Sequence, residues 1–132
     1  MATLISGILT QHRLTVDDYH HMAKAGILGP EDRVELIAGE VLDMLPIGSL
    51  HAALVTAVAR WLMLAAADRA LVAVQNPLRL DAVSEPQPDI AMLRPRADYF
   101  AAAHPRPADT LLVVEVGESS LATLLPTLDR NS

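Results

Sequence analysis

Apolar residues recur with helical spacing in two segments of this chain. Residues 15–25 begin with Thr15 and Asp18 in the form of a capping box, which marks the start of a helix, and Gly26 follows as its expected end. In residues 49–68 the apolar positions fit one face of a longer helix. The pattern therefore predicts two helices, the second with a core-facing stripe of leucine, valine and alanine.

Shorter apolar runs have the pattern of strands. Residues 34–37 and 40–45 flank Ala38-Gly39, and Gly39 can adopt positive φ, so this pair predicts a hairpin whose Glu40 and Asp43 face outward. Further strands are predicted at 71–80, interrupted by Asn76-Pro77, at 90–93 and at 110–116. We expect the last of these to be central in a sheet, and the whole to be one α/β (α+β) domain.

Three strand-like runs, residues 33–37, 87–93 and 111–116, each carry a carboxylate that their apolar pattern does not require: Glu35, Asp89 and Glu115. A buried carboxylate costs several kcal/mol unless it is paired, protonated or bound to a cation. One interpretation is a shared acidic pocket, whose simplest occupant is a divalent metal ion such as Mg²⁺. The alternative is that the three are surface or edge-strand carboxylates paired with arginine.

Composition narrows the class of protein. The 132 residues are 52 % hydrophobic and only 3 % aromatic, which favours a single domain with an aliphatic core. The net charge is −6, and nine arginines and the single Lys24 are scattered, so the tight phosphate grip of a basic patch is not expected. A metal-dependent nuclease stays compatible with this charge, because the metal ion supplies positive charge itself.

The absence of cysteine excludes disulfides, zinc–thiolate sites and cysteine nucleophiles, and it is compatible with a reducing cytoplasm, where we expect the protein to be. The first ten residues lack the basic region and cleavage site of a signal peptide. The apolar run at 61–67 is too short to span a bilayer, so no membrane association is expected. The five histidines show no metal spacing, and His51 is interpreted as a polar residue at a helix start.

Taken in order, these segments resemble the Uma2 family, bacterial proteins described as restriction endonucleases within the PD-(D/E)xK nuclease-like superfamily. Each segment is a weak signal, but their order and spacing together are specific. The resemblance covers about residues 13 to 121. It is carried by residues 14–19, 25–28, 33–41, 44–48 with His51, 74–80, 85–90 and 112–116.

The resemblance implies a restriction-endonuclease-like fold, with a mixed central sheet flanked by helices, and Mg²⁺- or Mn²⁺-dependent hydrolysis of DNA. Pro88-Asp89 matches the PD motif, which implies that Asp89 is a metal ligand. Glu115 matches the acidic residue of (D/E)xK and is implied as a second ligand, with the carbonyl of Val116 as a third. Glu35 is implied to assist the metal or the attacking water, and Gln75 to line the same cleft.

The chain also departs from the family pattern. Gly117 stands where the (D/E)xK lysine is expected, and the resemblance implies that a lysine from a following helix takes over this role in the family. The resemblance ends near Leu121, so we expect that lysine-bearing helix to be lost here. We therefore expect a flexible arm at 1–13, a C-terminally incomplete Uma2-like domain at 14–120 and a divergent tail at 121–132. Loss of one preorganised cationic donor typically costs about 10²–10³ in rate, so impaired catalysis is expected.

Two other hypotheses remain open. The domain could be a non-catalytic interaction or dimerisation module with the same fold, which the missing lysine and the acidic net charge favour, or a truncated gene remnant that folds poorly. DNA as substrate and a homodimer are the partners expected. Glu85, in a Pro-rich loop, is expected to be solvated.

Overall fold

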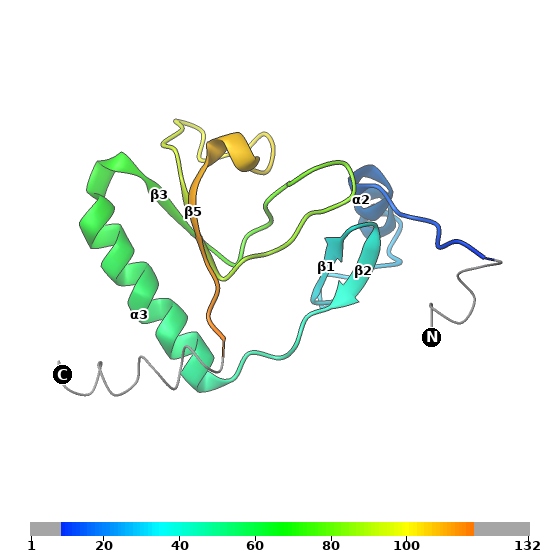
Figure 1. The fold of residues 1–132 in the computed structure, drawn as a ribbon, viewed down its shortest axis with the longest axis horizontal. Coiled ribbons are helices and arrows are strands. Elements are labelled where there is room, and N and C mark those ends of the chain that lie inside the picture. The colour runs from blue at the N-terminus through cyan, green and yellow to red at the C-terminus, as the bar shows by residue number, and fades with distance from the viewer. Residues whose placement is uncertain (1–8, 118–132) are drawn as a thin grey trace. The chain divides into compact units, whose positions relative to one another are not determined.

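The computed structural model describes residues 9–117, and the expected tail at 121–132 lies outside them. The described chain forms two compact units, residues 9–44 with 80–86 and residues 45–79 with 87–117 (Figure 1). The first contains a helix and a two-stranded sheet, and the second contains a long helix and a three-stranded sheet. This confirms the α+β fold class, and every strand pairing among the described residues is antiparallel.

In the first unit, helix α2 (Val16–Lys24) begins with the predicted capping box. The Asp18 amide donates to Thr15 Oγ1 at 3.1 Å, and the Thr15 amide donates to Asp18 Oδ2 at 2.9 Å. Two of the helix's orphan donor groups are thus satisfied. Gly26 follows the helix end with φ +80, in the left-handed region that favours glycine.

The predicted hairpin follows, with β1 (Val34–Ile37) and β2 (Glu40–Asp43) joined through Ala38 and Gly39. Both turn residues have positive φ, +50 and +81, as a tight two-residue hairpin requires. Residues 83–85 lie along the other edge of β1, where the Glu85 amide donates to the Leu36 carbonyl at 2.7 Å. Glu40 and Asp43 are exposed, which confirms their predicted outward position.

The second unit is built on an antiparallel sheet in the order β3 (Leu71–Val74), β4 (Ile90–Leu93), β5 (Thr110–Val114). Helix α3 (Ser49–Ala66) packs on one face of it, and a short 3-10 turn (Ala67–Arg69) leads from the helix to β3. A second such turn (Pro107–Asp109) precedes β5. The core between helix and sheet contains Leu54, Val55, Ala59, Leu62, Ile90 and Val116.

The prediction that residues 110–116 form a central strand is wrong. Among the described strands β4 is in the middle, and β5 pairs with β4 alone. Leu111, Leu112 and Val113 are between 42 % and 47 % exposed, although they form a continuous apolar run. Apolar content alone does not distinguish a middle strand from an edge strand, because both are rich in aliphatic residues.

The strand predicted at 71–80 ends at Val74. Gln75 adopts φ +54, which is incompatible with continued β structure, and Pro77 has no amide to donate to a ladder. The strand therefore ends close to Asn76-Pro77, where the sequence indicated only an interruption.

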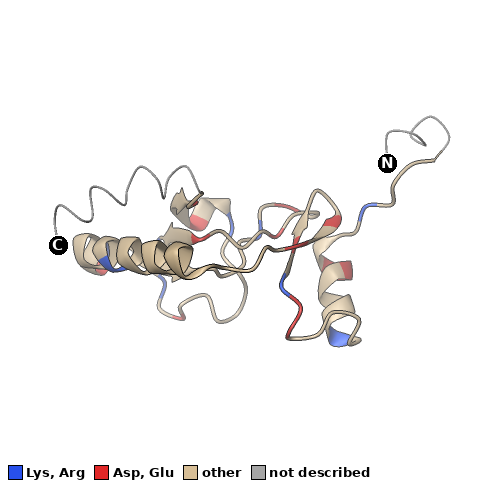
Figure 2. Cartoon of the chain, turned by 90° about the horizontal axis from the view of Figure 1, so that it is seen from below, with Lys and Arg blue, Asp and Glu red and all other residues tan. Residues whose placement is uncertain are grey.

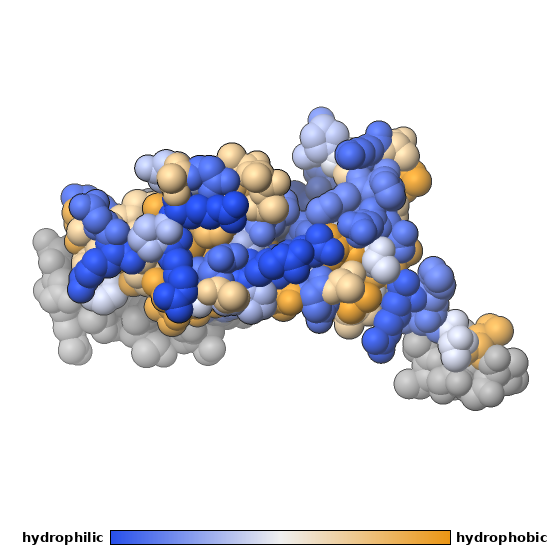
Figure 3. Space-filling view, turned by 90° about the horizontal axis from the view of Figure 1, so that it is seen from above, coloured by the Kyte–Doolittle hydropathy of each residue, from blue (hydrophilic) through white to orange (hydrophobic). Residues whose placement is uncertain are grey.

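One side of α3 is not covered by the described part of the chain. Leu50, Trp61 and Leu64 are 59 %, 67 % and 72 % exposed, and the helix is free of charged residues over most of its length (Figure 2). By length and composition alone the helical segment at residues 49–69 could cross a membrane, but a core helix of a water-soluble domain meets the same criterion. On the face drawn in Figure 3, hydrophilic side chains cover much of the described surface and apolar ones appear in patches between them.

The capping box gives a pH-dependent prediction. Hydrogen bonds from the Thr15 backbone and side chain lower the pKa of Asp18 below 3.8. A carboxylate with a depressed folded-state pKa stabilises the fold above its unfolded pKa, and this stability is lost as the pH falls through the folded pKa. We expect Asp18→Asn to be less stable than the wild type above pH 3.8, with the difference shrinking at lower pH. Urea unfolding on both sides of pH 3.8 measures it, and a pH-independent difference would contradict the prediction.

Candidate active site

Strands β4 and β5 bring two of the predicted acidic residues to one end of the sheet. Ile90 pairs with Val114 in antiparallel register, so Asp89 and Glu115, one step further along each strand, occupy facing positions. On the other side Val74 pairs with Ile90, and the Gln75 amide donates to the Asp89 carbonyl at 3.0 Å. Three residues singled out by sequence therefore form one row across the end of the three-stranded sheet.

The Asp89 carboxylate is held by two contacts. Its Oδ1 lies 3.1 Å from Nε2 of His51 on α3, and its Oδ2 accepts the Val116 amide at 2.8 Å. The Asp89 and His51 side chains are only 14 % and 24 % exposed. Asp89 lies in a bend immediately before β4, which allows its side chain to turn toward the helix. The carboxylate is therefore fixed in orientation and partly removed from solvent.

The first turn of α3 contains no acidic side chain of its own, and its N-cap Gly48 makes no side-chain capping bond. His51 is the third residue of α3, so the contact between His51 and Asp89 places the Asp89 carboxylate beside the first turn of this helix. A negative charge near a helix N-terminus is stabilised by the helix dipole. The helix end therefore adds to the two contacts that hold the Asp89 carboxylate in place.

Glu115 directly follows β5 and is exposed. It lies between Val114 and Val116, which both pack toward the core under α3. Val116 reaches Asp89 through its backbone amide, and the predicted role of its carbonyl as a ligand stays a prediction. Glu35 is half-buried on β1 of the first unit, opposite Leu42, and its predicted role likewise stays a prediction.

Carboxylate oxygens such as those of Asp89 and Glu115 are the ligands that a hard divalent cation prefers. An ionised carboxylate offers about four lone-pair sites, and His51 and Val116 use only two of those on Asp89. Within residues 9–117, neither Asp89 nor Glu115 belongs to a group of three acidic or histidine side chains whose ligand atoms all lie within 4.8 Å. Water would complete the ligand set, as is usual for Mg²⁺ held by one or two carboxylates.

The contact of His51 with Asp89 is a feature that the sequence analysis missed. The sequence identified His51 only as a polar residue at a helix start, because His51 and Asp89 are 38 positions apart. The available signal was that both residues fall within segments of the family resemblance. Their pairing depends on how α3 crosses the sheet.

A second acidic group lies in the first unit. Glu85 was expected to be solvated, which is wrong: it is 2 % exposed, because residues 83–85 pair along β1. Both of its carboxylate oxygens lie 3.0 Å from His20 Nε2. Burial raises the pKa of the neighbouring Tyr19, and the negative charges of Glu85 and Glu35 raise it further. The pairing explains how a buried carboxylate is tolerated, and it ties α2 to the segment at 83–85.

The α+β fold, with two helices and two small antiparallel sheets, is consistent with a restriction-endonuclease-like domain. A comparison with protein families agrees: the Uma2 model, described as "Putative restriction endonuclease", matches residues 16–125. The chain therefore belongs to the Uma2 family. No curated protein and no solved structure gave a match to it.

The His51 contact leads to a prediction about metal affinity. Removing a hydrogen-bond partner that orients a metal ligand typically weakens binding by about 10–100-fold. We expect His51→Ala to lower Mn²⁺ affinity in this range while the fold is retained, since His51 is on the first turn of α3 and only partly buried. Calorimetric titration with Mn²⁺ measures the change. His12→Ala, at an exposed residue of the other unit, is the control. Equal affinities for wild type and His51→Ala would contradict a positioning role.

Proposed function

We propose that this chain is a divalent-metal-dependent endonuclease domain that hydrolyses phosphodiester bonds in DNA. The observation that carries the proposal is the facing placement of Asp89 and Glu115 at the end of β4 and β5, with the Asp89 carboxylate fixed by His51 and Val116. Membership of a family described as restriction endonucleases supports the same chemistry.

In this proposal Asp89 and Glu115 hold Mg²⁺ or Mn²⁺, with the carbonyl of Val116 as a further ligand. When bound, such an ion polarises a phosphate oxygen and lowers the pKa of a coordinated water. His51 orients Asp89 and so fixes the direction of its free lone pairs. The role of Glu35, which belongs to the first unit, in assisting the attacking water stays a prediction.

The missing lysine limits the expected rate. Gly117 occupies the position two residues after Glu115, and the single lysine, Lys24, is exposed on α2. Because Gly117 supplies no cation at this position, we propose that the rate is about 10²–10³ lower than that of a site with a lysine there.

This difference can be tested by adding the charge. An added Cβ at Gly117 meets no atom within 4 Å, and Gly117 does not have positive φ, so Gly117→Lys is expected to fold. We expect the variant to cleave plasmid DNA faster than the wild type in Mn²⁺, by at least about tenfold if it recovers part of the missing donor. Gel electrophoresis of supercoiled plasmid against time measures the rate, with Gly117→Gln as a control of similar length without charge.

Two further arms test the proposed activity itself. Adding Asp89→Asn to Gly117→Lys is expected to remove cleavage, as is excess chelator. If Gly117→Lys binds Mn²⁺ yet produces no nicked or linear plasmid, hydrolysis of DNA is not the function of this domain.

A non-catalytic interaction module is the second candidate function. The exposed apolar residues of β5 and α3 favour it, because a strand edge without charged or proline residues readily pairs with another strand. A homodimer through such a surface would appear in light scattering at micromolar concentration as twice the 14.2 kDa chain mass. A monomer that retains metal binding would favour the endonuclease proposal instead.

A further inference from the structure

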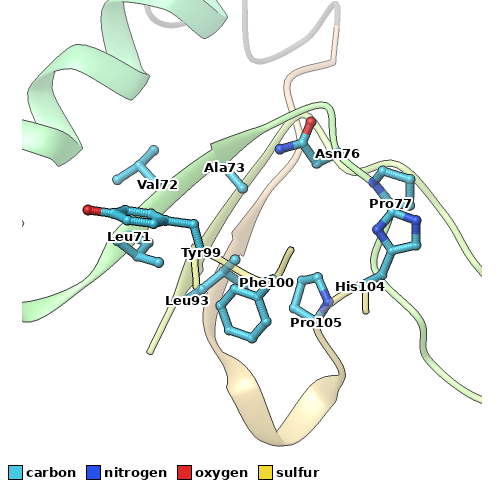
Figure 4. Close-up of a pocket in the computed structure, with 10 residues that line it drawn as sticks. All are labelled: Leu71, Val72, Ala73, Asn76, Pro77, Leu93, Tyr99, Phe100, His104 and Pro105. Atoms are coloured by element: carbon cyan, nitrogen blue, oxygen red, sulfur yellow. The ribbon is translucent and has the colours of Figure 1, made fainter. Parts of the chain in front are cut away.

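The second unit contains a cavity of about 390 Å³ between β3 and the loop that follows β4 (Figure 4). Leu71, Ala73 and Leu93 give it an apolar floor. The rings of Tyr99 and Phe100 lie on one side of it, and those of Pro77 and His104 lie on the other. A largely apolar cavity of this size with a few polar groups is the usual form of a small-ligand site.

The loop that forms the aromatic side is held in an unusual conformation. Tyr99 and Phe100 both have positive φ, +53 and +61, which is costly for bulky residues. Asp98 stabilises this arrangement, because it accepts the Phe100 amide at 3.1 Å and lies 2.8 Å from Nε of Arg96. The Arg96 guanidinium in turn lies over the Phe100 ring at 5.2 Å.

The strained backbone buries Phe100 to 9 % exposure and leaves Tyr99 75 % exposed at the cavity. An exposed tyrosine at a cavity mouth, held by a hydrogen-bonded loop, is a preorganised surface for a flat ring. Strain of this kind persists where surrounding contacts fix it, and it is concentrated at ligand sites.

The cavity also has polar groups beside its apolar floor. Asn76 and His104 line it, and the Asn76 side chain offers both a donor and an acceptor. Asn76 directly follows Gln75, whose amide donates to the Asp89 carbonyl. The cavity is thus joined to the candidate active site by one residue of the chain.

We propose that this cavity binds the base of an unpaired nucleotide next to the phosphate that is cleaved, an inference that rests on the proposed endonuclease function. A nucleobase is flat, fits within the cavity volume and presents two apolar faces with a polar edge. Tyr99 would stack on one face, the sheet floor would contact the other side, and the Asn76 amide would pair with the edge. The preferred substrate is therefore DNA with an unpaired base, and not fully paired duplex.

The first test uses the full chain with dAMP and deoxyribose 5-phosphate, which share the phosphate but differ in the base. Calorimetric titration is expected to show binding of dAMP and at least about fivefold weaker binding of deoxyribose 5-phosphate. Tyr99→Ala and Asn76→Ala are each expected to remove most of this difference. Trp61 is an aromatic residue of similar exposure on α3, so Trp61→Ala is the matched control and is expected to leave the difference unchanged.

The second test separates a free nucleotide from a base within DNA. Single-stranded oligonucleotides, intact or with a central abasic site, are titrated in Mn²⁺-free buffer to prevent cleavage. Tighter binding of the intact strand, lost in Tyr99→Ala, supports a base within DNA. If dAMP binds more tightly than deoxyribose 5-phosphate but the intact and abasic strands bind equally, the assignment to DNA is overturned. If dAMP and deoxyribose 5-phosphate bind with equal affinity, the base site itself is overturned. Far-UV circular dichroism confirms that the exposed-residue variants are folded.

Asp89→Ala distinguishes this inference from the proposed function. Asp89 does not line the cavity, so the base preference should survive in that variant, whereas cleavage should not. A chain that binds bases but never cleaves DNA would contradict the proposed function and leave the base site standing. Cleavage that is equally fast for Tyr99→Ala and wild type on the intact strand would overturn the base site alone.

Discussion

Replacing Asp89 with alanine is expected to remove specific Mg²⁺ or Mn²⁺ binding, with the apparent affinity falling by more than the about 10–100-fold typical of an orienting residue. The reason is that Asp89 is the carboxylate with both a fixed orientation and free lone pairs. Glu115 alone is exposed and would hold the ion only weakly. Calorimetric titration of wild type and variant with Mn²⁺ measures the loss.

The alanine variant has a second consequence, so a matched variant is needed. Asp89→Ala leaves the Val116 amide without its acceptor, and an unsatisfied buried donor costs about 1–3 kcal/mol of stability. Asp89→Asn keeps an acceptor oxygen but loses the charge. We expect it to retain more stability than Asp89→Ala while losing metal binding as fully.

Asp68→Ala removes an exposed carboxylate of the same unit and serves as the surface control. It is expected to bind Mn²⁺ like the wild type. If Asp89→Asn also binds Mn²⁺ like the wild type, the ion is held elsewhere and the assignment of Asp89 as a ligand is wrong.

Much of the fold could be predicted because its signals are local. The capping box of Thr15 and Asp18 fixes the start of α2, and Gly39 fixes the hairpin turn, since both depend on residues within three positions. Strand β4 has the predicted bounds, 90–93, because Pro88 and Pro95 delimit a short apolar run. In each case neighbouring residues decide the conformation.

The predictions that were wrong concern how segments far apart in the sequence are placed next to one another. The position of β5 beside β4 alone, and the burial of Glu85, depend on which segments pair, and no local pattern encodes that choice. The left-handed backbone of Tyr99 and Phe100 depends on the contacts that Asp98 makes with the loop. Propensity alone would not predict such a conformation for two aromatic residues.

The residues of the candidate site likewise include some that could be predicted from the sequence and some that could not. Asp89 and Glu115 could be found from sequence because each interrupts an apolar run, and the register then places them at facing positions. His51 and the Val116 amide could not, since their contacts with Asp89 arise from the packing of α3 and from the bend before β4. The sequence indicates which groups carry charge, and tertiary packing determines which of them are oriented.

The largest expected effect on stability is that of Gly39→Ala. Gly39 has φ +81, and a Cβ added there would lie 2.5 Å from Arg13 Cβ and 2.9 Å from Arg13 Cα. The segment at Arg13 cannot easily move away, because the Leu14 amide donates to the Gly39 carbonyl at 3.0 Å and the Gly39 amide donates to Val83. Left-handed strain and overpacking together are expected to cost about 2–5 kcal/mol.

Gly26→Ala is the matched control for this prediction. Gly26 has nearly the same backbone conformation, φ +80, but an added Cβ there meets no atom within 4 Å. Its expected cost is therefore the conformational strain alone, about 1–2 kcal/mol. Urea unfolding of both variants and the wild type measures the two losses of unfolding free energy. Their difference isolates the contact between the hairpin turn and Arg13, because the backbone strain is common to both glycines. Equal losses would show that the chain before α2 does not pack closely on the turn.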